Sequence, residues 1–134
     1  MKKKFLLNVL AYLIPTMVLG MCWHFVFFKD VYDELRIYNR AEPIIPLGMS
    51  SMLIQGIIFA HLYPFYQATG SAMIRAMKYA MLMGLLLFTV TTLANGAKIE
   101  VSSMVTWLEV QTAFTVVQVG LYGTALGFLN RHDS

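Results

Sequence analysis

Residues 101–130 read VSSMVTWLEVQTAFTVVQVGLYGTALGFLN, and this stretch decides the fold because it is long and apolar enough to cross a bilayer. At 3.6 residues per turn, one side of the predicted helix carries a polar stripe made of Gln111, Thr115, Gln118 and Tyr122. Its other side carries a carboxylate, Glu109, and near the same azimuth Gly120, Gly123 and Gly127. Amides are costly to leave unsatisfied in hydrocarbon, and glycines let another backbone approach. We therefore expect protein on both sides of this helix.

The composition of the whole chain is that of a membrane protein. Of its 134 residues, 58% are hydrophobic and only 13% are charged, which is too apolar for a soluble domain of this size. The net charge of +3 does not indicate a nucleic-acid partner, because Lys2, Lys3 and Lys4 directly precede an apolar run and act as a topological signal. That run ends in aromatic residues and lacks a small-residue cleavage site, so we predict a retained helix instead of a signal peptide.

Apolar runs predict four membrane-spanning helices, at about residues 5–28, 44–66, 73–95 and 101–130. Between the first two lies a charged surface segment, residues 29–42. In it Val31, Leu35 and Tyr38 recur at helical spacing, which predicts a short amphipathic helix on the membrane surface. Four spans with short connections predict an all-α membrane protein in which residues 1–134 form a single integral membrane domain. Its architecture is expected to be an antiparallel bundle of four transmembrane helices.

Small and polar residues mark the helix faces that should lie inside the bundle. In the first helix, one face contains Asn8, Tyr12, Thr16 and Trp23. In the second helix, the predicted packing face contains Gly48, Ser51 and Gln55. In the third helix, Met73, Met77 and Met81 recur every four residues, which is typical of core packing or lipid contact because thioethers fill irregular gaps.

The candidate functional site centres on Glu109, the only carboxylate within the predicted spans. By depth along the helices, His24 lies in the same leaflet, and with Gln111 and Thr112 the pair is a candidate for ligand binding or proton coupling. Two structural alternatives remain open: a hydrogen-bonded clasp between His24 and Glu109, or a Glu109 that reaches the outer surface beside Trp107. His24 and His61 fall in opposite leaflets, so a haem shared between them is not expected.

No catalytic or metal-ligand motif is found in the sequence, and Cys22 is its only cysteine. We therefore expect no enzymatic activity, no cofactor, no metal and no nucleic-acid partner. The overall plan combines an aromatic end of the first helix at residues 23–28, an acidic surface segment and three further short-looped spans. This plan resembles small four-helix bacterial membrane proteins of unknown function. The resemblance is one of architecture and implies no activity and no site residues.

The predicted function is that of a non-enzymatic integral membrane protein acting through helix-helix contacts. Its partners would be the lipid bilayer and other membrane protein subunits or itself, as an accessory subunit of a larger complex or as a homo-oligomer. The alternative is a small transporter or channel with Glu109 as its proton- or cation-coupling group. Purification in mild detergent discriminates between the two, because it shows whether heterologous subunits accompany the chain.

The distribution of basic residues predicts the orientation in the membrane. Six of the ten lie on the side of the two termini, namely Lys2, Lys3, Lys4, Arg75, Lys78 and Arg131. The other four lie on the opposite side, namely Lys29, Arg36, Arg40 and Lys98. Because basic loops favour the cytoplasmic side, the sequence predicts a multi-pass protein of the cell membrane, the inner membrane in bacteria, with both termini cytoplasmic.

Overall fold

The computed structural model describes residues 2–37 and 40–133, and within them all regular secondary structure is helical. Four helical segments are long and apolar enough to cross a membrane, which indicates a multi-pass membrane protein. They cover Lys2–Phe27, Ile45–Phe65, Ala72–Gly96 and Met104–Leu129. Each boundary lies within a single helical turn of the one predicted from the sequence.

Two of the four segments contain a π-helical turn in their outer part, defined here as the part far from the termini. Helix α1 (Lys2–Cys22) continues into η1 (Trp23–Phe27). Helix α4 (Ala72–Phe88) continues into η3 (Thr89–Leu93) and then into the short α5 (Ala94–Gly96). A π turn displaces the side chains that follow it around the helix axis, so each segment changes the face that it presents near its outer end.

The other two long helices, α3 (Ile45–Leu62) and α6 (Met104–Leu129), begin at residues that are favoured at a helix N-terminus. Helix α3 has proline in its first turn, where the missing N–H costs no hydrogen bond, and it passes into the 3₁₀ turn η2 (Tyr63–Phe65). Helix α6 is capped by Ser103, whose side chain accepts a hydrogen bond from the backbone N–H of Thr106, and a short turn, η4 (Arg131–Asp133), follows it.

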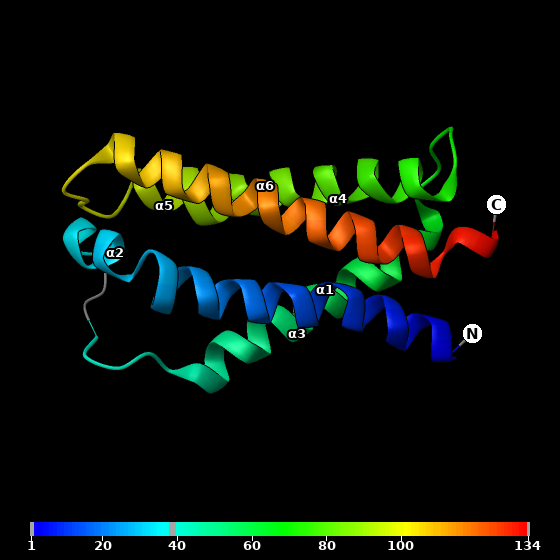
Figure 1. Cartoon of the computed structure of the whole chain (residues 1–134), viewed down its shortest axis with the longest axis horizontal. Helices are drawn as coiled ribbons and strands as arrows, with labels where there is room; N and C mark the ends of the chain where they lie inside the picture. The colour runs from blue at the N-terminus through cyan, green and yellow to red at the C-terminus, as the bar shows by residue number, and fades with distance from the viewer. Residues whose placement is uncertain (1, 38–39, 134) are drawn as a thin grey trace.

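Helices α1 and α6 lie side by side, α3 packs on α1, and α4 packs on α6. Figure 1 shows both termini at one end of the molecule, and α2 (Lys29–Leu35) with the loop that precedes α6 at the opposite end. Helix α3 crosses α1 obliquely. Residues 40–51 are all exposed, and the first fully buried residue of α3 is Gly56. The outer half of α3 is therefore separated from the rest of the molecule.

A short helix, α2, forms in the segment where the sequence predicts an amphipathic surface helix, and its apolar side is buried within the molecule. Tyr32 is 0% exposed and Leu35 is 1% exposed, and both belong to one buried cluster with Trp23 and Trp107. The helix thus covers the outer end of the α1/α6 pair, because its apolar residues find an aromatic surface there. The predicted contribution of Tyr38 lies outside the described residues.

The predicted polar stripe of α6 lies inside the molecule. Gln111, Gln118 and Tyr122 are buried, and Thr115 is half-buried. The Gln118 side-chain amide donates hydrogen bonds to the hydroxyl oxygens of Tyr12 (3.4 Å) and Thr16 (3.3 Å), both on the predicted inward face of α1.

This network extends to α3 and is continued by an aromatic core. The Tyr12 hydroxyl donates to Gln55 Oε1 at 2.6 Å, and Gln55 in turn donates to the Ser51 hydroxyl. The rings of Phe59 and Tyr122 pack edge-on against Tyr12, with centroids at 5.0 and 5.2 Å. The hydroxyl of Tyr12 and the amides of Gln55 and Gln118 therefore have partners on or beside neighbouring helices, whereas the Tyr122 hydroxyl is buried and has no hydrogen-bond partner among the described residues.

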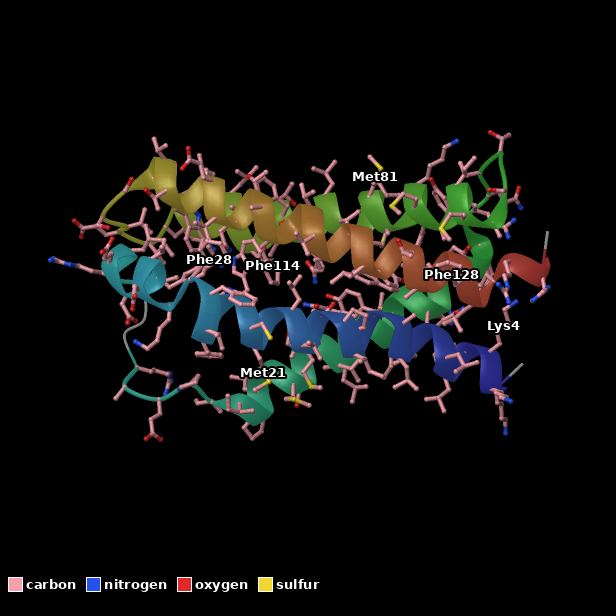
Figure 2. The ribbon with its side chains drawn as sticks, viewed as in Figure 1. Lys4, Met21, Phe28, Met81, Phe114 and Phe128 are labelled. Atoms are coloured by element: carbon pink, nitrogen blue, oxygen red, sulfur yellow. The ribbon has the colours of Figure 1, made fainter. Side chains whose placement is uncertain are left out.

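The glycine side of α6 contacts α4 within the same chain. A Cβ atom built on Gly123 would lie 3.1 Å from Ala80 Cβ and 3.2 Å from Met77 Cα, and one on Gly127 would lie 3.1 Å from Met73 Cα. These contacts also place Met73 and Met77 in helix packing, whereas Met81 is 59% exposed and points away from the other helices in Figure 2.

Two other predicted packing glycines have no neighbour. Nothing lies within 4 Å of a Cβ built on Gly48 or on Gly120, so neither glycine makes a close contact within the described part of the chain, and their role in helix packing stays a prediction. In α3 the close approach is made by Gly56, whose added Cβ would lie 3.3 Å from the Val9 carbonyl oxygen. Helix α3 is inclined to α1, so the two helices come into contact near Gly56 and are still apart at Gly48.

Candidate functional site

A lateral groove of about 340 Å³ lies where the outer half of α3 separates from α1 and α6. Four methionines line it, two from α1 and two from α3, namely Met17, Met21, Met49 and Met52. Figure 2 shows Met21 on the side of α1 that faces α3. Methionine side chains are flexible and polarisable, so walls of this kind adapt to apolar surfaces of different shape.

Polar groups from three elements line the same groove: His24, Tyr32 and Gln111. The Tyr32 hydroxyl donates to Gln111 Oε1 at 2.5 Å, and the imidazole of His24 stacks on the Tyr32 ring with centroids 4.6 Å apart. His24 Nδ1 lies 2.9 Å from the Gly20 carbonyl oxygen. A carbonyl only accepts, so Nδ1 carries a proton and, in the neutral ring, Nε2 is an acceptor.

Two of these polar groups are available to a ligand. Among the described residues, neither His24 Nε2 nor the Gln111 side-chain amide nitrogen has a hydrogen-bond partner. The groove therefore combines apolar walls with one acceptor and one donor, at a depth where water is scarce if the helices span a bilayer. A group that contacts both would itself have to be polar.

An aromatic cluster holds these groups in place. The Trp23 ring packs against Phe28 and Phe114 with centroids at 4.4 and 5.8 Å, and Figure 2 shows these two phenylalanines between the end of α1 and α6. The Trp107 indole N–H donates to the Thr92 carbonyl oxygen, within η3, at 3.2 Å. The two π turns thus lie against the cluster, and rigid rings fix the position of Tyr32 and hence of His24 and Gln111.

The structure brings together only half of the predicted coupling site. His24 and Gln111 meet at Tyr32, whereas Glu109 and Thr112 are exposed. Among the described residues Glu109 forms no hydrogen bond or ion pair, so of the two structural alternatives the clasp to His24 is not present. Glu109 lies about 7.5 Å from the start of α6 at 1.5 Å per residue, and its side chain can reach the aqueous boundary from there.

Sequence reasoning missed Tyr32, which links the two predicted residues. Tyr32 and Leu35 are three residues apart and therefore share one face of a short helix. Val31 and Leu35, four residues apart, share a face equally well, so the spacing alone did not single out Tyr32. The methionines of the groove carried no comparable signal. No family model, curated protein or solved structure matches the chain.

Proposed function

We propose that the chain is a non-enzymatic protein of the cell membrane, that its four long helices cross the bilayer as an antiparallel bundle, and that it works through helix-helix contact with another membrane chain. The observation that carries this proposal is the separation of α3. Residues 45–51 of this helix are all exposed, and the helix borders a groove that polar groups of other elements also line. The partner is a transmembrane helix that lies in this groove.

The chemistry of the groove favours a helix over lipid tails. Gly48 has open space around it, and glycine lets a second backbone approach closely. The methionine walls suit the irregular surface of an incoming helix. His24 Nε2 and the Gln111 amide can pair with a polar side chain of that helix, whereas hydrocarbon would leave both without a partner.

The basic residues support an orientation with both termini cytoplasmic, because the end that holds the termini contains six of the ten. A reporter that is active only outside the cytoplasm should be inactive when fused after Ser134. The same reporter inserted in the loop before α6, at Ser102, should be active. The reverse pattern would show that the bundle is inverted.

Filling the groove should weaken association with the partner. Gly48→Leu places a large side chain in the groove without a clash inside the chain, so folding should be retained while the partner helix is excluded. Gly120→Leu is the matched control, because a Cβ built on Gly120 likewise has nothing within 4 Å, but Gly120 does not line the groove. We expect the yield of a cross-link formed within native membranes to fall about tenfold in Gly48→Leu and to be unchanged in Gly120→Leu.

The mass of the cross-linked species identifies the kind of partner. A product of twice the mass of this chain indicates a homo-oligomer, and a reproducible product of any other mass indicates an accessory role beside a different subunit. Equal yields from wild type, Gly48→Leu and Gly120→Leu would contradict the proposal, because the groove would then be occupied by lipid.

A further inference from the structure

A second cavity, of about 1190 Å³, lies at the end of the molecule where both termini are found. It is an open cavity lined by the first turns of α1, the η2 turn and the first turn of α4, together with Asn130 after α6. It lies far from the groove beside α3, whose lining residues come from the opposite ends of the same helices. Nothing in the proposed helix contact makes use of it.

The cavity has a basic rim. Lys2, Lys4, His61 and Arg75 line it, and none of its described lining residues is acidic. Figure 2 shows Lys4 at this end of the molecule. The Arg75 side chain is half-buried and, among the described residues, forms no hydrogen bond or ion pair. Its guanidinium donors are therefore available to an anion, and the planar fork of arginine suits phosphate oxygens.

A buried amide pair lies deeper in the cavity. Asn130 Nδ2 donates to Asn8 Oδ1 at 3.0 Å and to the Leu126 carbonyl oxygen at 2.7 Å. The two asparagines are only 4% and 2% exposed, yet both line the cavity. Among the described residues the remaining donor, Asn8 Nδ2, has no partner. Asn8 Nδ2 is not one of the fully buried polar atoms that lack a partner, so it is accessible from the cavity and can donate to an acceptor of a ligand.

Apolar side chains form much of the remaining wall, among them Phe5, Ala60 and Phe65. A free inorganic anion would leave this wall unused. The volume is also larger than the roughly 300–1,000 Å³ of common small-ligand pockets. Basic groups at the rim and apolar groups inside match an amphiphile with an anionic head, and basic pockets between transmembrane helices on the cytoplasmic side are suited to such lipids.

We propose that this cavity binds an anionic phospholipid of the adjoining leaflet, with its phosphate held by Arg75 and the lysines and an oxygen of its head group accepting from Asn8. The proposal rests on the membrane placement proposed above, and it is independent of the partner helix. Because the site lies at the basic end of the molecule, it selects lipid of the cytoplasmic leaflet.

Native mass spectrometry of the full-length protein in detergent tests the site, with phosphatidylglycerol and phosphatidylcholine of identical acyl chains as probes. The wild type should bind one phosphatidylglycerol at least about tenfold more tightly than phosphatidylcholine, and Arg75→Gln should lose about tenfold in affinity for phosphatidylglycerol. Lys3→Gln is the matched control: it removes one positive charge at the same end of the molecule, from an exposed side chain that does not line the cavity.

Each remaining outcome decides against the site. Equal losses in Arg75→Gln and Lys3→Gln would show attraction to net charge alone. Competition by millimolar inorganic phosphate as strong as that by the lipid would assign the cavity to a free anion. A protein that inserts into lipid nanodiscs yet binds both lipids equally would overturn the lipid site while leaving the membrane placement intact. Arg75→Glu serves as a second variant, and affinity for phosphatidylglycerol equal to that of the wild type would contradict the role of Arg75.

Discussion

Gly123→Leu should destabilise the protein by about 3 kcal/mol, because its side chain cannot fit between α6 and α4. Even a Cβ atom at this position would lie 3.2 Å from Met77 Cα and 2.8 Å from its sulfur atom. The sulfur can move, but the backbone of α4 can do so only if the two helices separate. The free energy of unfolding, measured by SDS titration in mixed micelles with far-UV circular dichroism, should report this loss.

Gly120→Leu provides the control for that experiment, since it adds the same side chain to the same helix where nothing lies within 4 Å. We expect its free energy of unfolding to stay within about 0.5 kcal/mol of the wild type. If the two variants were destabilised equally, the cost would come from the helix backbone or from contact with lipid, and the close packing of α4 on α6 would be in doubt.

Trp107→Ala should have a comparable effect at the outer end of the molecule. Trp107 is 4% exposed, packs against Gly96 of α5, and belongs to the aromatic cluster that holds Tyr32. Its removal leaves a cavity that neighbouring rigid rings cannot fill, with an expected cost of about 3 kcal/mol. Trp23 is then the only tryptophan in the chain, so its fluorescence follows the unfolding of the same cluster.

Trp107→Phe separates packing from hydrogen bonding. Phenylalanine keeps an aromatic ring in the cluster but cannot donate to the Thr92 carbonyl oxygen, so we expect a loss of only about 1 kcal/mol. An alanine variant no less stable than the phenylalanine variant would show that the ring contributes little packing, and that α5 and α6 are held together elsewhere.

Hydrophobic length and helical periodicity were sufficient to predict the four long helices and the inward faces of α1 and α6. Gln118 and Tyr12 illustrate why: a polar group in an apolar span has few favourable positions other than the interior, where it can pair with another helix. The same reasoning placed Tyr122 inside, and the structure confirms that it is 2% exposed.

The neighbours of each face could not be predicted in the same way. The glycines of α6 indicated a close contact, but the sequence does not state whether Gly123 meets α4 of its own chain or another molecule, because the packing chemistry is identical. Helix α3 is apolar around most of its circumference, so nothing in its pattern distinguished the half that contacts α1 from the half that does not.

The candidate site was predicted in part for a related reason. Depth along a helix correctly placed His24 and Gln111 in the same half of the molecule, because an α-helix rises by a fixed 1.5 Å per residue. Glu109 lies on a different side of α6 from Gln111 and is exposed, whereas Gln111 is buried and accepts a hydrogen bond from Tyr32 of α2, a partner that depth along the helix could not identify.

The hydrogen bonds between α1 and α6 also impose an order on biosynthesis. Asn8 pairs with Asn130, which is 122 residues later in the chain, and Thr16 pairs with Gln118, which is 102 residues later. At ribosomal rates of roughly 5–20 residues per second, the first helix waits on the order of ten seconds for the last one. In the membrane placement proposed here, its polar face must stay within the translocon, or against another protein, until synthesis is complete.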